Sequence, residues 1–445
     1  MFDLFCGIWS EPGCAYAPFI TMNVRDEDDP VMLSKRLNRL YKAGFGGVVI
    51  RHAGSCSDPY FSRLGLILEK AKNRGMSVII EADDSVVSER SGKLGRLCPM
   101  DSAAAHLPAF RVFRKTEKGR TASVSLTAGE GLEPYEIGYT EDPSMPDRLC
   151  DAYAEAVISM ILEPVSERFG KYLGSTLAGF MLRRAGAECV FPGETGTVPW
   201  NENIYGGFLS SGGDMEALMS LLEEPLVKKT GREAGHIMKQ ILCSCFCRYA
   251  LDPLRKWCDG RNLLLFADSF DPLDPTVADH VSAPGACLSD FHGAKLAADC
   301  ARHRGLPKCW GVIDGSEDLS AVQDRIYTAV RSGCNMTVIV NGADPCTDPL
   351  GEEREEDLRI VTSFIKRMSW LASSGSDLPE AAVLCSPEHL PKRQAGKLAE
   401  AGYSFNYLTV LDLMERAHVH GDGIHIDRYE YGTVLVDSAM RIDAE

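Results

Sequence analysis

Long apolar runs, a basic surplus and a leader pattern are all missing from this sequence. No apolar stretch approaches the ~20 residues that a membrane-spanning helix needs. The opening residues, MFDLFC, show no basic segment followed by an apolar core. Lysine and arginine number 47 against 63 aspartates and glutamates, a formal net charge of −16. So acidic a chain is a poor partner for nucleic acid or an anionic membrane, and we expect a cytoplasmic protein that binds neither.

Cysteine is abundant, but its spacing is that of neither a disulfide framework nor a metal site. The 16 cysteines are scattered, most of them within apolar stretches. Cys243 and Cys247 share one face of a helical pattern and could hold a metal, but no second pair accompanies them. Buried reduced thiols are therefore the favoured interpretation. Residues 206–213 are rich in glycine yet lack the lysine of a phosphate-binding loop. We predict no metal and no cofactor.

Short β-branched segments alternate with longer amphipathic ones along most of the chain. This alternation is typical of an α/β protein with a mostly parallel sheet. Helices are expected between most of the strands, for example over residues 31–43, where Leu33, Leu37 and Leu40 form one stripe. The pattern predicts a (β/α)8 TIM barrel over residues 1–373. Its eight strands are expected at residues 18–22, 47–51, 77–82, 177–182, 262–267, 286–289, 308–313 and 336–341.

Two segments interrupt the barrel pattern, and a third follows it. Residues 103–145, after the third strand, hold apolar runs separated by turn residues and predict a β-rich insertion. Residues 188–214 are rich in glycine and proline and predict a lid-like loop over the barrel mouth. Strand and helix patterns restart in residues 377–445, which predict a small, partial α/β domain. Within it, residues 418–426 predict a hairpin whose three histidines either bind a metal or, as we favour, form a polar face.

The order and spacing of several short segments carry a family resemblance. They lie at residues 44–50, 59–61, 71–79, 169–180, 198–200, 254–258, 295–298, 331–335, 403–408 and 431–436. Together they resemble the barrel and the following α/β domain of α-L-rhamnosidase-type glycoside hydrolases (family 106), over nearly the whole chain. The resemblance implies a carbohydrate ligand and chemistry at the carboxyl ends of the barrel strands.

The sequence departs from that family where the chemistry lies. Hydrolysis of a glycosidic bond normally takes two carboxyl groups flanking the bond. In the family the fourth strand leads into an Asp-Glu-Pro-like tripeptide, and the matching residues here are Arg183, Arg184 and Ala185. A guanidinium keeps its proton at any working pH and cannot act as a general acid. The family also places a glutamate at the end of the seventh strand, where Asp314 is the nearest acid here.

Two functional hypotheses follow from these departures. In the first, Arg183 or Arg184 pairs with Asp268 or Asp314, and the protein is a catalytically degenerate one that binds carbohydrate or acts as a scaffold. In the second, Asp268 and Asp314 form a relocated catalytic pair that acts on an acidic or rhamnose-like sugar, and the arginines bind its anionic group bidentately. Solvated charges at the barrel rim without a role, or an unrelated activity, complete the alternatives.

The candidate site residues come from the predicted strand ends and from the lid-like loop. The catalytic candidates are Asp268, Asp314 and Glu81. The candidates for substrate binding are His52, Arg183, Arg184, Trp200 and Asn341. Trp200 is included because an aromatic face can stack on a sugar ring. The sequence does not fix the sugar, the linkage or the oligomeric state.

Overall fold

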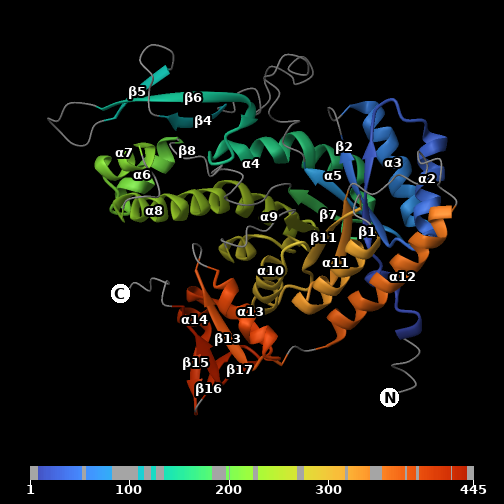
Figure 1. Cartoon of the computed structure of the whole chain (residues 1–445). Coiled ribbons are helices and arrows are strands. Elements are labelled where there is room, and N and C mark those ends of the chain that lie inside the picture. The colour runs from blue at the N-terminus through green and yellow to red at the C-terminus, as the bar shows by residue number, and fades with distance from the viewer. Residues whose placement is uncertain are drawn as a thin grey trace. The chain divides into compact units, whose positions relative to one another are not determined.

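The fold is taken from a computed structural model of the chain, shown in Figure 1. The structure describes residues 9–52, 57–82, 109–114, 122–126, 135–182, 197–199, 201–223, 229–267, 275–315, 319–340, 353–375, 378–386, 390–421 and 423–437. The chain divides into two compact units. The first comprises Met1–Glu81, Phe169–Ala185 and Cys258–Glu445, and the second comprises Ala82–Arg168 and Gly186–Trp257. The domain boundary expected near residues 373–377 falls inside the first unit and stays a prediction.

An eight-stranded parallel sheet forms the centre of the first unit. Its strands are β1 (Phe19–Val24), β2 (Gly47–His52), β3 (Ser77–Ala82), β7 (Leu177–Leu182), β9 (Leu264–Ala267), β10 (Gly285–Cys287), β11 (Trp310–Asp314) and β12 (Met336–Val340). They lie side by side in the order β10-β11-β12-β1-β2-β3-β7-β9. The two ends of this order meet, because Phe266 and Ala283 form a parallel bridge and Ser282 N donates to Leu265 O at 2.9 Å. The predicted (β/α)8 TIM barrel and its eight strands are therefore confirmed.

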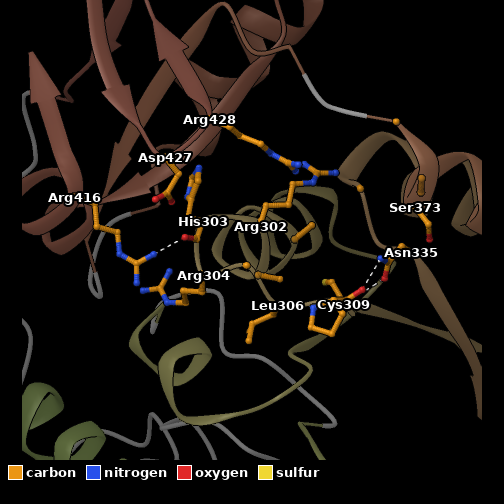
Figure 2. Close-up of a pocket in the computed structure, with 17 residues that line it drawn as sticks. Arg302, His303, Arg304, Leu306, Cys309, Asn335, Ser373, Arg416, Asp427 and Arg428 are labelled. Atoms are coloured by element: carbon orange, nitrogen blue, oxygen red, sulfur yellow. Dashed lines mark hydrogen bonds between the residues drawn. The ribbon is translucent and has the colours of Figure 1, made fainter. Parts of the chain in front are cut away.

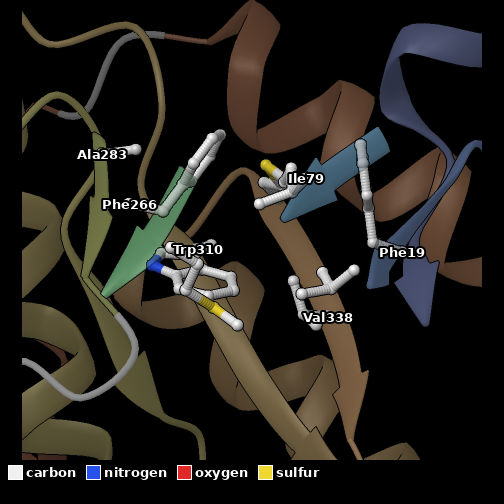
Figure 3. Close-up of a cluster of buried hydrophobic side chains, with 9 residues drawn as sticks. Phe19, Ile79, Phe266, Ala283, Trp310 and Val338 are labelled. Carbon is white, nitrogen blue, oxygen red and sulfur yellow. The ribbon is translucent and has the colours of Figure 1, made fainter. Parts of the chain in front are cut away.

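One layer of apolar side chains fills the barrel, as Figure 3 shows. Every strand, or the segment just before it, contributes to this layer, which comprises Phe19, Val49, Ile79, Met181, Phe266, Ala283, Trp310, Met336 and Val338. The rings of Phe266 and Trp310 meet edge to face with their centroids 5.7 Å apart. The interior is thus a packed core and not a pore, and any ligand of the barrel is confined to the strand ends and their loops.

Two glycines make room for the largest rings of that layer. Gly47 lies beside Phe19 in the register of β1 and β2, and a Cβ on Gly47 would lie 2.2 Å from the Phe19 ring. Gly285 lies beside Trp310 in the same way, and its Cβ would lie 1.9 Å from the indole Nε1. Real Cβ atoms essentially never approach other heavy atoms closer than 3.0 Å. Each glycine therefore fixes where its neighbouring ring can lie.

Five helices of the first unit follow barrel strands in the chain. They are α2 (Pro30–Lys42), α3 (Asp58–Lys72), α10 (Phe291–His303), α11 (Leu319–Ser332) and α12 (Glu353–Ser374). Contacts join α10 to α11, α11 to α12, α12 to α2 and α2 to α3, so these helices form a continuous outer layer (Figure 1). Helix α2 buries Leu33, Leu37 and Leu40, as its stripe predicted. None of the helices within the described ranges combines the length and apolar character needed to cross a bilayer.

The second unit contains an antiparallel sheet and a group of helices. Its strands β4 (Ala109–Arg114), β5 (Ala122–Leu126), β6 (Tyr135–Pro146) and β8 (Thr197–Pro199) lie in the order β5-β6-β4-β8. This sheet confirms the β-rich insertion after the third barrel strand. The helices of this part of the chain are α4 (Ala152–Val157), α5 (Glu163–Phe169), α6 (Glu202–Ser210), α7 (Met215–Glu223), α8 (Lys229–Phe246) and α9 (Asp252–Asp259). Cys243 and Cys247, at the end of α8 and just after it, are buried and form no disulfide among the described residues.

The segment at residues 188–214 is not the irregular loop that its composition indicated, because its described part contains β8 and α6. Helix α6 forms despite its two glycines because Asn201 caps it, its side chain accepting from Ile204 N at 2.9 Å. Ile204 and Phe208 are buried on one face of the helix, so packing outweighs local composition. Whether this segment covers a site stays a prediction.

The small C-terminal α/β domain is confirmed. Strands β13 (Ala381–Cys385), β14 (Phe405–Thr409) and β18 (Thr433–Leu435) form a parallel sheet with helices α13 (Lys392–Glu400) and α14 (Val410–Arg416). Strands β15 (Ala417–His420), β16 (Gly423–Ile426) and β17 (Tyr429–Tyr431) form an antiparallel sheet, which confirms the predicted hairpin. Across it the rings of His420 and His425 lie 5.9 Å apart. Among the described residues no group of three or more His, Cys, Asp or Glu side chains could hold a metal.

Helix α10 and the C-terminal α/β domain meet through buried polar side chains, which we call the α10 joint (Lys295, Asp299, His303, Asn406 and Tyr431). Lys295 Nζ lies 2.5 Å from Asp299 Oδ1 and donates to Asn406 Oδ1 at 2.8 Å. Asn406 Nδ2 donates to the Tyr431 hydroxyl at 3.2 Å, and that hydroxyl lies 3.1 Å from His303 Nε2. All five residues are at most 5% exposed. The joint is therefore a chain of hydrogen bonds in a dry interface.

Candidate active site at the barrel mouth

The carboxyl ends of the barrel strands form the candidate site, because the interior beneath them is packed. Side chains alternate along a strand, so residues two positions apart lie on the same face. Val49 and Ile79 belong to the inward layer. Arg51 and Glu81, two residues further along β2 and β3, therefore share the inward face one layer closer to the mouth.

Arg51 and Glu81 form an ion pair at this position. The register of β2 and β3 places Ile50 beside Ile80, so the next residues of the two strands are adjacent. Arg51 Nε donates to Glu81 Oε2 at 2.9 Å, with side chains 20% and 0% exposed. Such a charge-assisted hydrogen bond is stronger than a neutral one, and its burial protects it from screening by salt. The structure thus keeps Glu81, a predicted catalytic candidate, in contact with a guanidinium.

Asp314 ends β11 on the same face as Trp310, which belongs to the inward layer. Its side chain is partly exposed, unlike that of the neighbouring Ile313. The backbone holds this strand end in place, since Gly315 N donates to Val340 O at 2.7 Å. Asp314 is therefore a rim carboxylate within reach of solvent.

The structure does not bring the other predicted site residues into view. His52 ends β2, paired in register with Val24, but its side chain lies outside the described residues. The remaining candidates, all outside the described residues, are Asp268, Arg183, Arg184, Trp200 and Asn341.

Arg51 is the site residue that sequence reasoning missed. A signal was present, because Arg51 is a charged residue that directly follows the apolar run GVVI of residues 47–50. The sequence alone, however, does not tell which face of this strand points into the barrel. Because Val49 belongs to the inward layer, Arg51, two residues later, also faces inward.

A scan against models of protein families finds no match, and a search of curated proteins finds none. Solved structures do match. A rhamnosidase from Novosphingobium sp. PP1Y has a TM-score of 0.64 at 11% identity, over 97% of this chain and 67% of that one. The catalytic domain of a beta-amylase from Paenibacillus polymyxa has a TM-score of 0.45 at 12% identity, over 78% and 98% of the two chains. A GH5_18 protein from Streptomyces cattleya has a TM-score of 0.44 at 11% identity, over 90% and 94%.

These comparisons concern the fold alone. Two proteins that share 11% of their residues can differ in every catalytic group. The match to the rhamnosidase therefore shows a shared fold and not a shared activity. The two lower TM-scores add no argument. The closed parallel barrel and this likeness agree that the chain has a glycoside-hydrolase-like TIM-barrel fold.

Proposed function

We propose that this chain binds a carbohydrate at the carboxyl ends of its barrel strands and hydrolyses it poorly or not at all. The observation that carries the proposal is the ion pair between Arg51 and Glu81, which commits a rim carboxylate to a guanidinium. An ionised carboxylate accepts hydrogen bonds and has no proton to give to a leaving group. Arginine has five N–H donors, of which the contact with Glu81 engages one, so Arg51 suits binding of sugar hydroxyls.

The same reasoning extends to charged residues that follow two other strands. Met181 and Phe266 lie in the inward layer. Strand alternation carried two residues further gives Arg183 and Asp268, both outside the described residues, so their orientation stays a prediction. On the inward face they would add charge of both signs around the ion pair. An arginine at the family's acid position supports a degenerate site.

The ligand class rests on the resemblance and on the fold. The segments that resemble the rhamnosidase-type family span most of the chain, and a rhamnosidase shares the barrel. Trp200 adds a possible stacking surface for a sugar ring, while His52, Arg184 and Asn341 remain further candidates for contact. A scaffolding protein without a sugar ligand is the related outcome that the experiment separates.

A second candidate function is an active glycosidase with a relocated carboxylate pair. The observation that favours it is Asp314, which is partly exposed on the inward face of β11. Asp268 would be its partner, and an acidic or rhamnose-like sugar its substrate. The two carboxyl groups would need a separation of about 5 to 10 Å.

Two assays of the full chain test the proposal, a glycan array and a screen of aryl glycosides that includes α-L-rhamnosides. We expect binding to a restricted set of glycans without turnover. Arg51→Gln should weaken that binding at least tenfold. Glu69→Gln removes a carboxylate from the exposed face of α3 and should leave binding unchanged.

Turnover that Asp268→Asn or Asp314→Asn abolishes would replace the proposal with the active glycosidase. If the chain neither binds nor hydrolyses any glycan, the carbohydrate function is wrong and a scaffolding role survives. If Arg51→Gln binds as tightly as the parent chain, the ligand does not use the inward rim.

A further inference from the structure

We infer that a cavity at the amino-terminal end of the barrel binds a small organic molecule that carries a phosphate or sulfate group. The inference is independent of the sugar function proposed for the opposite end of the strands. The cavity has a volume of about 660 Å³, which falls within the range of small-molecule sites. Its wall is formed by the end of α10, the turns before β11 and β12, the end of α12, and the C-terminal α/β domain.

The wall of this cavity is unusually basic for a chain of net charge −16. Arg302, Arg304, Arg416 and Arg428 all line it, whereas Asp427 is the single carboxylate among the described residues of the wall. A guanidinium presents planar N–H donors that match phosphate and sulfate oxygens bidentately. Four such groups around one cavity point to an oxyanion as the ligand.

Two of these arginines hold the wall together. Arg304 donates Nη2 to Asp279 Oδ2 at 2.8 Å, and its Nη1 lies 3.5 Å from Asp412 Oδ1. Arg416 donates to the backbone oxygen of His303 and lies near the same Asp412. Their charges are therefore matched by carboxylates behind the wall. These contacts hold the wall of the cavity in shape.

Arg302 and Arg428 are the arginines placed to hold the ligand. In Figure 2 the Arg428 side chain extends toward Arg302, while the carboxylate of the adjacent Asp427 lies beside His303. Arg428 Nη2 donates to the Tyr429 hydroxyl at 3.0 Å, and no carboxylate of the described residues pairs with Arg428. Two like charges that approach each other from different elements are stabilised by an anion between them.

The backbone at Gly333 fixes the position of the Arg302 guanidinium. A Cβ on Gly333 would lie 1.5 Å from Arg302 Nη2, so the guanidinium rests directly on this glycine. Gly333 has φ +89°, a conformation that favours glycine, and it ends α11 with its N–H on Ala329 O at 2.9 Å. Arg302 Nη1 also lies 3.3 Å from Asp299 Oδ1 of the α10 joint. The guanidinium is therefore pre-positioned, which lowers the entropic cost of binding.

His303 belongs to the wall of the same cavity. Asn406 Oδ1 accepts from Lys295, which leaves Asn406 Nδ2 to donate to the Tyr431 hydroxyl. That hydroxyl can then give its own proton to His303 Nε2, and this order of donors places the imidazole proton on Nδ1. His303 is 2% exposed, and its Nδ1 has no hydrogen-bond partner among the described residues. The imidazole therefore lies behind the cavity wall, where the α10 joint holds it in place.

Isothermal titration of the full chain tests the site with inorganic phosphate, inorganic sulfate, a hexose phosphate and the parent hexose. We expect saturable one-to-one binding of the hexose phosphate, at least tenfold tighter than inorganic phosphate and absent for the hexose. Arg302→Gln and Arg428→Gln should each weaken binding at least tenfold. Asp427→Asn removes a carboxylate that lines the cavity and should tighten binding several-fold.

The matched control is Arg393→Gln, which removes an exposed arginine of α13 and should change nothing. Arg428 is exposed, and within the described residues its side chain contacts Tyr429, so its variant reports on binding even if Arg302→Gln unfolds the chain. Absence of saturable binding by any anion at millimolar concentration overturns the inference. If Arg393→Gln weakens binding equally, the inference is also overturned, because the anion would then be held by nonspecific electrostatic attraction to the protein surface. Equal affinity for inorganic phosphate and the hexose phosphate would overturn the claim that the cavity recognises the organic portion of its ligand.

Discussion

The barrel interior and the α10 joint are buried to a similar degree, yet they are held by different forces. The interior is a layer of apolar side chains in which Phe19 and Trp310 lie against glycines of the neighbouring strands. The joint instead buries Lys295 and Asp299 within a chain of hydrogen bonds. The first region gains from removing apolar surface from water, whereas the second must satisfy every polar group it buries.

This difference decides how each region responds to change. In an apolar core, the free energy of unfolding falls in proportion to the cavity that a truncation leaves, because neighbouring side chains relax only partly into the space. In a buried chain of hydrogen bonds, loss of any one side chain lowers the free energy of unfolding sharply, because its former partner stays buried without a hydrogen bond. The comparison can be tested with matched substitutions in the two regions.

In the barrel interior, Trp310→Ala should lower the free energy of unfolding by about 3–5 kcal/mol, the usual cost of truncating a fully buried aromatic ring. The indole is 0% exposed and contacts Phe266 edge to face. Urea unfolding followed by far-ultraviolet circular dichroism measures the change. Met414→Ala, at a side chain 73% exposed, is the control and should cost less than about 0.5 kcal/mol. A loss under about 1 kcal/mol for Trp310→Ala would contradict the packed interior.

In the α10 joint, Asp299→Asn should cost about 3–5 kcal/mol although it changes almost no volume, because it leaves the Lys295 ammonium buried without its carboxylate. The same unfolding measurement applies. Asp290→Asn is the matched control, since Asp290 pairs with Lys392 where the two side chains are 37% and 47% exposed. There we expect a change of about 0.2–1 kcal/mol. Equal effects of the two substitutions would mean that the joint is wetter than the structure indicates.

Sequence patterns predicted the apolar region well and the polar region not at all. Strand β12 was expected because Thr337, Val338 and Ile339 form a short β-branched run, and such runs give both the strand and its burial. The polar joint has no such period. His303 and Tyr431 are 128 residues apart, and nothing local to either residue indicates that they meet. The same holds for the arginine-lined cavity, whose wall comes from separate turns and helix ends.

The candidate active site lies between these two cases. The sequence placed Glu81 and Asp314 at strand ends, and the structure puts both on the inward face. It could not name Arg51 as the partner of Glu81, because the inward face of β2 depends on how eight distant strands close into one ring. Asp268 and Arg183 stay predictions for the same face.

The pH dependence of stability should reveal the burial of His303. Burial lowers its pKa from the ordinary 6.5 to about 4. Between these values the unfolded chain takes up a proton that the folded chain does not, so stability falls as the pH drops from about 6.5 to about 4. The contribution of this group reaches on the order of 3 kcal/mol. Urea unfolding at pH 7 and pH 4.5 should show a smaller drop for His303→Gln than for the parent chain.

The exposed His418→Gln variant isolates that contribution, because it removes a histidine on the surface of the hairpin. It should show the same acid loss as the parent chain. If His303→Gln also shows that loss in full, His303 is not the buried neutral group that the α10 joint requires. The pH range matters, since below about pH 4 the protonation of carboxylates adds to the effect in every variant.

The smallest expected effects come from two glycine substitutions, one in the barrel and one in the C-terminal α/β domain. Gly285→Ala should destabilise the chain by about 1–3 kcal/mol, because its Cβ would lie 1.9 Å from the Trp310 indole and must displace that ring. Gly396→Ala, within α13, meets nothing within 4 Å and should stabilise the chain by about 0.5–1 kcal/mol by favouring the helix. The same chemical change thus has opposite signs at two glycines. If Trp310→Phe restores stability to Gly285→Ala, the clash with the indole is the cause, whereas an additive loss would place the strain in the β10 backbone.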